Sequence, residues 1–343
     1  MTRYVTPVGK NVRTGPVGPI YAQLKTDFGF VGEMFMSLSP APEVLAATWA
    51  LLRESLLAGP SSRTDKEVIA LGVSLANRCP FCVDAHTVLL HATGDHALGE
   101  AIARGERPAD PHHATLLAWA RRERPAALPA DHVGTALAFH FINRMVSALV
   151  GENLFPAGTA SSPVVRRAAG TAMARVVRRR LVAGESLPLL ALGRRPAGPE
   201  PAWADGSPVG TAYAALRQAA EGRVLGEHAR AVVRAAVEEH DATHPPLGTA
   251  WLDGPLAELP ADERPAVRLA LLGALAPYRI TEADVAAWPA PDADLVRLLA
   301  FGAFAAVEHV EREIIRGVPG TPPAPSSATA SPSASAAAPS GTR

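Results

Sequence analysis

The sequence predicts an all-α fold, and three observations lead to this prediction. Apolar residues recur with helical spacing along most of the chain, and no stretch alternates polar and apolar residues as a β-strand does. Alanine and leucine are abundant while aromatic residues make up only 5% of the chain, a composition that favours helices packed through small side chains. Hydrophobic residues reach 48%, which is enough to form a sizeable core.

The first elements follow from local start and stop signals. Residues 1–20 contain several prolines and glycines, so we expect an extended lead-in and then a helix from Tyr21. Ser39 precedes a proline-containing first turn and predicts the cap of a helix over Val44–Ala58, which a Gly-Pro pair ends.

Thr64 and the acidic residue after it predict the cap of an apolar helix that carries Glu67. The same periodicity predicts further helices in the first half, over Cys82–Thr93, Asp95–Arg104, His113–Arg122, Asp131–Val150 and Pro163–Ala183. In the second half it predicts helices over Val209–Glu221, Leu225–His240, Asp262–Ala276, Glu282–Trp288 and Asp292–Arg316. The arginines of 163–183 indicate either an anion-binding surface or a solvated helix face, and the solvated face is favoured.

Composition predicts four regions. Residues 1–185 form a first helical unit, and the Pro- and Gly-rich stretch 186–207 reads as a linker. Residues 208–316 form a second helical unit. Residues 317–343 are rich in Pro, Ser, Ala and Thr with almost no charge, which predicts a disordered tail because such a segment has too little apolar surface to form a core.

The two helical units look like copies of one unit. Residues 16–25 resemble residues 208–217, and further on Pro80-Phe81 aligns with Pro277-Tyr278. The alternative is chance similarity in an Ala- and Leu-rich chain. In this alignment the second copy replaces Glu67, Cys79, Cys82 and His86 by Arg264, Ala276, Arg279 and Ala283.

Charge and hydropathy exclude some functions. The chain has 33 basic and 33 acidic residues, a balance that argues against a general nucleic-acid binder. The first residues lack the apolar core of a signal peptide, and no apolar run is long enough to span a membrane. We therefore expect a cytoplasmic protein without membrane contact. In a reducing compartment a Cys-x-x-Cys pair is more often redox-active or metal-binding than a structural bridge.

The two cysteines, Cys79 and Cys82, are the only ones in the chain and have this spacing. A helix that starts at Pro80 would place both sulfurs at its positive end, where thiolate is favoured. His86 follows Cys82 by four residues and so lies one turn further along the same face. Glu67 lies twelve residues before Cys79, at the start of an apolar run. These residues indicate a redox site, a three-ligand zinc site or two inert buried cysteines.

The order Glu67, Cys79-x-x-Cys82, His86 resembles the alkylhydroperoxidase D-like proteins of the carboxymuconolactone decarboxylase superfamily. The resemblance implies an alkylhydroperoxidase D-like helical bundle in which the dithiol reduces hydroperoxides, with no cofactor. It also implies a dithiol reductant, such as a dihydrolipoyl group on a partner protein, and a homo-oligomer. Phe81 stands where alkylhydroperoxidase D has a histidine.

In this reading Cys82 attacks the peroxide because His86 lies within reach of its thiol, and Cys79 then closes a disulfide. His86 accepts the thiol proton and Glu67 orients it. Two other functions stay open at this point. Carboxymuconolactone decarboxylation needs no dithiol, and a non-enzymatic helical assembly module would explain a degenerate second copy.

Overall fold

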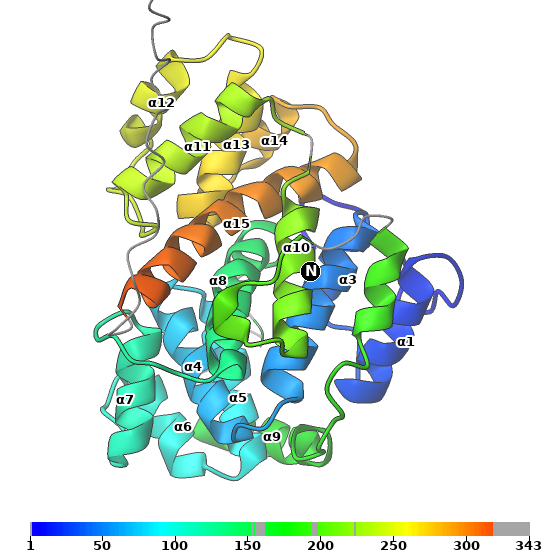
Figure 1. Cartoon of the computed structure of the whole chain (residues 1–343), viewed down its shortest axis with the longest axis vertical. Helices are drawn as coiled ribbons and strands as arrows, with labels where there is room; N and C mark the ends of the chain where they lie inside the picture. The colour runs from blue at the N-terminus through cyan, green and yellow to red at the C-terminus, as the bar shows by residue number, and fades with distance from the viewer. Residues whose placement is uncertain (1, 152–153, 155–161, 194–197, 223, 318–343) are drawn as a thin grey trace, which may run out of the picture.

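In the computed structural model of the chain, residues 2–151, 154, 162–193, 198–222 and 224–317 are described (Figure 1). Their architecture is all-α, as predicted. The described residues contain no β-strand beyond an isolated antiparallel bridge between Thr2 and Val150. None of the described helices is both long and apolar enough to cross a membrane. The predicted tail, apart from Gly317, lies outside the described residues.

Most helices of the first half begin and end near the predicted residues, but the first begins at Val17 rather than Tyr21, the one predicted over Pro163–Ala183 ends at Val177, and the short helix Glu33–Ser37 was not predicted. The elements of this half are α1 (Val17–Asp27), α2 (Glu33–Ser37), α3 (Pro42–Leu52), the π-helical turn η1 (Arg53–Leu57), α4 (Arg63–Ala76), α5 (Pro80–Thr93), α6 (His96–Ala103), α7 (Pro111–Ala120), α8 (Ala130–Leu149) and α9 (Pro163–Val177).

The region predicted as a linker contains the short 3₁₀ turns η2 (Leu187–Gly193) and η3 (Ala202–Ala204). The second half then contains α10 (Pro208–Ala220), α11 (Glu227–Glu239), η4 (Ala250–Leu252), α12 (Asp253–Ala257), α13 (Arg264–Leu275), η5 (Pro277–Arg279), α14 (Glu282–Ala286) and α15 (Asp292–Arg316).

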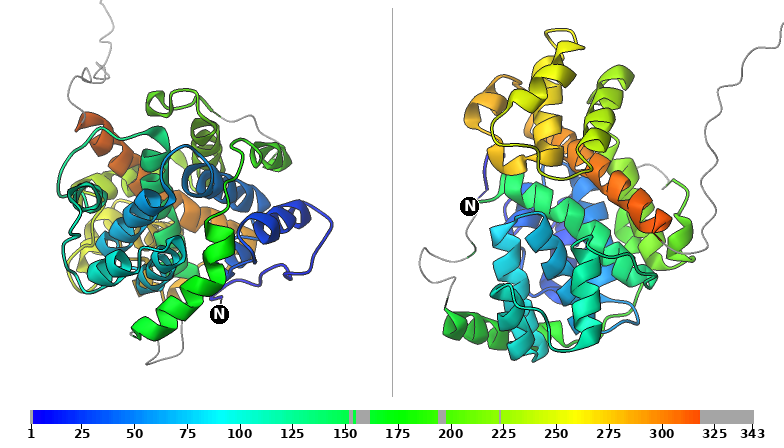
Figure 2. Two further views of the ribbon diagram at one scale, coloured as in Figure 1. Left: turned by 90° about the horizontal axis from the view of Figure 1, so that it is seen from below. Right: turned by 90° about the vertical axis from the view of Figure 1, so that its left-hand side faces the viewer.

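Helices α8 and α15 form the centre of the molecule. Nearly every side chain of α8 is buried, because it packs against α3, α4, α10, α13 and α15. Figure 1 shows α11, α13 and α14 at one end and α5, α6, α7 and α9 at the other, with α15 crossing between them. The side view in Figure 2 shows α15 running alongside α8. One hydrophobic cluster therefore includes residues from both halves.

The order of packed helices recurs in the two halves, so the fold contains two related units in tandem. Helix α4 packs on α8 and leads through a short turn into α5, which begins at Pro80. In the second half α13 packs on α15 and leads into a turn that begins at Pro277. Gly302 lets α13 and α15 approach closely, since a Cβ there would lie 2.2 Å from the carbonyl oxygen of Ala270.

Some local predictions were wrong. Ser39 does not cap α3; its hydroxyl donates to the carbonyl of Met36, and the helix begins after Ala41. Thr64 lies inside α4 and donates to Asp95. These polar side chains are satisfied by tertiary or turn contacts, which compete with capping.

The helix predicted over Val44–Ala58 changes to a π-helical turn at Arg53. The side chain of Arg53 is fully buried there and forms ion pairs with Asp27, Glu54 and Glu185. A buried arginine with carboxylate partners ties the start of the chain to the segment after α9.

The solvated face predicted for the Arg-rich helix is wrong at Arg166. This side chain is buried and pairs with Glu100 of α6, with Nη2 2.5 Å from Oε2. Helix α9 packs closely on α5 at Gly170, where a Cβ would lie 2.5 Å from that of His91. The helix therefore covers α5 on one side.

Candidate active site

Glu67 is a fully buried carboxylate on the second turn of α4. Its Oε1 accepts a hydrogen bond from Nε of Arg63, one turn earlier, at 2.7 Å. Its Oε2 lies 2.7 Å from Nδ1 of His86. Burial by itself raises the pKa of Glu67, but the Arg63 guanidinium and the His86 hydrogen bond outweigh it and hold that pKa below its usual value. Glu67 is therefore an anion inside the core.

His86 lies on α5, and its ring is held from two sides. Glu67 engages Nδ1, and the ring of Phe139 on α8 meets the imidazole edge-on with centroids 4.3 Å apart. The side chain is buried, with 4% of its surface exposed. Because Nδ1 faces a carboxylate, Nε2 is the ring nitrogen that remains for exchange of a proton.

The two cysteines lie at the start of α5. Cys79 is the residue before the helix and Pro80 its first helical residue, two residues before the predicted start at Cys82. Arg78 adopts a left-handed conformation (φ 51°) and turns the chain from the end of α4 into α5. Both thiols are free and buried. The helix start thus gathers both sulfurs next to its unpaired main-chain amides.

The environments of the two thiols differ. Burial opposes ionisation of Cys79, but the thiol and amide of Cys82 and the hydroxyl of Ser147 lower its pKa below the usual thiol value. Burial raises the pKa of Cys82 well above that value, and an ionised Cys79 beside it raises it further. Cys79 is therefore the first of the pair to ionise, and Cys82 needs a base.

A cavity of about 480 Å³ opens onto Cys82 and His86. Its other walls are apolar apart from Glu33 and come from the segment around α2 and from α3, η1, α5, α8 and α9. The lining side chains beyond the site residues include Phe28, Phe30, Val31, Met34, Phe35, Leu52, Leu56, Phe81, Ala85, Phe139, Ile142 and Met173. Cys79 does not line it but faces a separate cavity of about 310 Å³ with Ser147 and Tyr278.

Comparison with known proteins places this geometry in a family. The carboxymuconolactone decarboxylase family matches residues 42–121, a range that contains Glu67, Cys79, Cys82 and His86. An alkyl hydroperoxide reductase of Mycobacterium tuberculosis (strain ATCC 25618 / H37Rv) is 39% identical over 323 residues, which is 90% of this chain and 93% of the relative. The chain belongs to the carboxymuconolactone decarboxylase family. The family resemblance stated from the motif is thereby confirmed. No solved structure matches the chain.

The family match ends in the first half, and the second half carries other residues at the aligned positions. Ala276 is fully buried among apolar side chains. Arg279 donates from Nη1 to the carbonyls of Pro246 and Gly248, and Nε of Arg264 donates to the carbonyl of Leu259. These side chains stabilise loops of the second unit rather than rebuild the dithiol site.

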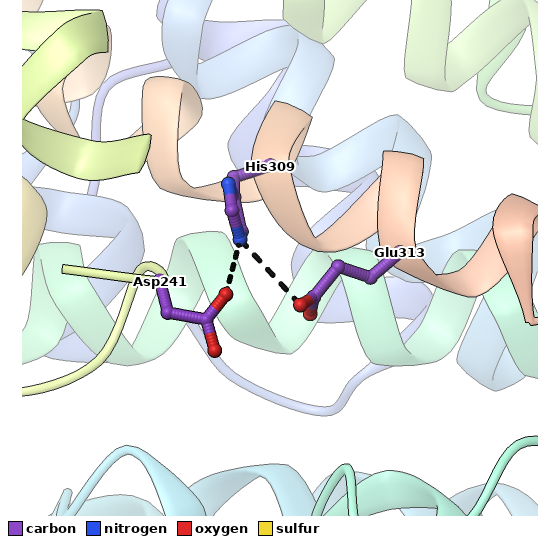
Figure 3. A group of neighbouring side chains, drawn as sticks. All are labelled: Asp241, His309 and Glu313. Atoms are coloured by element: carbon purple, nitrogen blue, oxygen red, sulfur yellow. Dashed lines mark hydrogen bonds and ion pairs between the residues drawn. The ribbon is translucent and has the colours of Figure 1, made fainter. Parts of the chain in front are cut away.

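Sequence reasoning missed one cluster of ionisable groups in the second half. Nε2 of His309 lies 2.9 Å from Oδ1 of Asp241 and 3.6 Å from Oε1 of Glu313 (Figure 3). The ligand atoms of these three lie within 4.8 Å of one another, close enough to share an ion. The guanidinium of Arg122 already contacts both carboxylates, so the arrangement is an ion-pair network that joins the end of α7 to α11 and α15.

Within the part of the chain that the structure describes, this cluster is the group of three that meets the distance requirement for a shared metal ion, and Cys79, Cys82 and His86 do not form such a group. His309 and Glu313 have helical i,i+4 spacing, a signal that the sequence did contain. Asp241 is remote in sequence, and only the packing of α11 on α15 brings it near.

His91 and His96 belong to a second polar cluster, which lies beside α5. His91 is buried on α5, with Nε2 2.9 Å from Oε1 of Glu100 and Nδ1 2.9 Å from Nδ1 of His96. Since Arg166 also binds Glu100, these side chains form a polar link among α5, α6 and α9. The link therefore helps to hold α5 against α6 and α9.

Proposed function

We propose that the chain is a thiol-dependent peroxidase that reduces hydroperoxides through a dithiol–disulfide cycle of Cys79 and Cys82. One observation carries the proposal: Cys82 and His86 line the same apolar cavity, while the buried carboxylate of Glu67 fixes Nδ1 of His86. The printed name of the Mycobacterium tuberculosis relative, an alkyl hydroperoxide reductase, supports the same class of reaction.

The first step is the attack of Cys82 on the hydroperoxide. Because burial keeps this thiol protonated, His86 removes its proton through Nε2 as the sulfur approaches the terminal peroxide oxygen. The S–O bond forms while the O–O bond breaks, and the departing alkoxide takes the proton from His86 to leave as an alcohol. Glu67 stabilises the imidazolium that forms between these transfers.

The second step closes the disulfide. The Cys79 thiolate attacks the sulfur of the Cys82 sulfenic acid, forms the S–S bond and releases hydroxide, which leaves as water after protonation. The lowered pKa of Cys79 suits this role, since the resolving sulfur has to be a thiolate.

The third step returns the enzyme to the dithiol. One thiolate of a dithiol reductant attacks Cys82 and expels Cys79, the sulfur of lower pKa and hence the better leaving group. The second thiol of the reductant then closes its own disulfide and releases Cys82. A dihydrolipoyl group on a partner protein carries the required dithiol. Its slender apolar arm would also fit a cavity lined with aliphatic and aromatic side chains.

The cavity favours organic hydroperoxides over hydrogen peroxide. Its volume of about 480 Å³ is within the range of sites for small organic ligands. A small polar substrate such as hydrogen peroxide would bury little apolar surface against its walls. Burial of an alkyl or aryl body against these walls would contribute about 25 cal/mol per Å² of apolar surface. We therefore propose a bulky apolar hydroperoxide as the substrate class.

The two other candidate functions explain less of the site. Decarboxylation of a carboxymuconolactone would use neither a resolving sulfur nor a reductant, and a scaffold would need no ionised carboxylate in its core. We also propose that residues 1–185 and 208–316 form the two helical units and that residues 186–207 link them. The proposed assembly is a homo-oligomer. A dithiol that has to be kept reduced fits a cytoplasmic location.

The test is a single-turnover reaction of the reduced chain with cumene hydroperoxide, tert-butyl hydroperoxide and hydrogen peroxide. Stopped-flow fluorescence follows the rate, and intact mass follows the loss of two hydrogen atoms as the disulfide closes. We expect one intramolecular disulfide per chain, formed fastest with the bulky substrate. Unchanged thiols after exposure to all three peroxides would contradict the peroxidase assignment.

A further inference from the structure

A second large cavity, of about 550 Å³, lies between the two halves and away from the Cys82 pocket. Its walls come from the end of α4, the segment after α7, α8, the loop after α11, α13 and the end of α15. The side chains that matter for its chemistry are Arg144, Asn143, His140, His244, Arg124 and Trp119.

Arg144 is the unusual group in this cavity. It lies on α8 with 6% of its surface exposed, and its guanidinium donates to main-chain carbonyls. Nε donates to Ala274 at 2.7 Å, Nη1 to His140 at 2.7 Å and Nη2 to Ala242 at 2.9 Å. These acceptors carry only partial charge. Within the described residues no carboxylate forms an ion pair with Arg144, in contrast to the buried Arg53 with its three carboxylates.

An unpaired buried charge is expensive, and the surroundings of Arg144 show that cost. Burial, together with the nearby Arg122, lowers the pKa of Arg144 well below its usual value, to about 9. Burial, followed by the charges of these arginines, also lowers the pKa of His140 far below its usual value. An anion in the cavity would relieve both effects.

Two side-chain nitrogens near Arg144 have no hydrogen-bond partner. Nδ2 of Asn143 is buried and has no hydrogen-bond partner, and Nδ1 of His244 is in the same condition. Both residues line the cavity. Buried polar groups are nearly always hydrogen-bonded in native proteins, so these unpaired nitrogens, of which the Asn143 amide is a donor, indicate a missing polar partner.

The acidic residues at the rim do not supply that acceptor. Asp241 and Glu313 contact Arg122, and Glu123 pairs with Arg121. The cavity is lined by four arginines and by these three carboxylates, which leaves a net excess of one positive charge, and among the described residues neither Arg144 nor Arg124 forms an ion pair with a carboxylate.

We propose that this cavity binds a small organic anion whose carboxylate or phosphate group pairs with Arg144. Nη1 and Nη2 each carry a second N–H beyond the one given to a main-chain carbonyl, with Asn77 Oδ1 no closer than 3.5 Å to Nη1, and the oxygens of a carboxylate or phosphate can accept from these two groups. Trp119, Pro125 and Ile314 form an apolar wall on which the body of the ligand packs. The volume is in the range of small-ligand sites. This site uses no part of the dithiol, so it stands independently of the peroxidase proposal.

The test uses the full chain at constant ionic strength with three anionic probes: inorganic phosphate, citrate and benzoate. Isothermal titration calorimetry gives affinity and stoichiometry, and benzamide serves as the neutral analogue of benzoate. We expect at least one anion to bind with one site per chain, no binding of benzamide, and a loss of affinity of about tenfold or more in Arg144→Gln.

Because Arg144→Gln removes contacts between the halves, a second measurement uses the unchanged protein. The ring signals of His140 and His244 in a ¹H–¹⁵N spectrum should shift on addition of the anion that binds, while those of the exposed His228 should not. Binding that leaves both cavity histidines unmoved, or no binding of any of the three anions at millimolar concentrations, would overturn the proposal.

Discussion

Replacing Glu67 by glutamine is the most direct test of the relay. The substitution keeps the size of the side chain but removes the charge that both Arg63 and His86 contact at 2.7 Å. A hydrogen bond to a charged group contributes about 1.5–3 kcal/mol, and each 1.36 kcal/mol in a barrier is a tenfold change in rate. If His86 becomes an imidazolium during the attack, Glu67→Gln should slow peroxide oxidation of the dithiol about 10- to 150-fold near neutral pH.

The pH dependence separates this effect from a loss of structure. At higher pH more Cys82 ionises without help from His86, so the deficit of Glu67→Gln should shrink as pH rises. The effect of Glu67→Gln on the free energy of unfolding should appear at acidic pH instead. The pKa of Glu67 is lower in the folded chain than its usual 4.5, so its charge stabilises the fold above that value, and this stabilisation is lost as pH falls through the folded pKa. Because glutamine does not ionise, the free energy of unfolding of Glu67→Gln should lack this decrease at acidic pH.

The assay is stopped-flow oxidation of the reduced protein, with a thiol titration to show that two cysteines remain reactive. Glu106→Gln is the matched control, because Glu106 is exposed and pairs only with the neighbouring exposed Arg104. An oxidation rate for Glu67→Gln equal to that of the control throughout the neutral range would refute the relay.

The other predictions concern the sulfurs, the pocket and the core. In Cys79→Ser, peroxide should still produce a sulfenic acid at Cys82 that a dimedone probe labels, and in Cys82→Ser labelling should be slow; rapid labelling of Cys79 would reverse the two roles. Ala85→Phe fills part of the apolar cavity, so KM for cumene hydroperoxide should rise on the order of tenfold while hydrogen peroxide is little affected; equal effects on both would show that the bulky substrate does not use this cavity. Arg53→Met should lower the free energy of unfolding in urea by about 3–5 kcal/mol because it leaves buried carboxylates unpaired. Arg104→Met should change it little, and a loss no larger in Arg53→Met than in this control would show that the buried ion pairs do not stabilise the fold.

The relation of sequence to structure is clearest in α5 and α15. The end of α5 was predicted at Thr93, where the structure has it, and Gly94 after it adopts the left-handed conformation (φ 110°) that ends such helices; the start lies at Pro80, two residues before the predicted Cys82. The limits of α15 were predicted at Asp292 and Arg316, where the structure has them. These signals are local, since they depend on steric and hydrogen-bonding preferences of adjacent residues.

The less accurate predictions involve residues whose partners are distant in sequence. Arg166 was expected on a solvated helix face, yet it is buried against Glu100 of α6, where His91 also lies. The π-helical turn at Arg53 likewise depends on Asp27 and Glu185. A polar residue next to apolar ones has the same local pattern whether it meets water or a carboxylate, so the sequence does not distinguish these cases.

The sequence by itself determined the helical class, most helix limits and the identity of the four candidate site residues, because helix periodicity and the spacing of Cys79, Cys82 and His86 operate over one or two turns. Only the tertiary structure decided which sulfur faces the apolar cavity, what Glu67 touches and where Arg144 lies without an anionic partner. These features arise where α4, α5 and α8 meet segments far away in the chain. Burial then changes the free energy of ionisation of each side chain. This free energy depends on the atoms that surround the group in space rather than on its neighbours in the sequence.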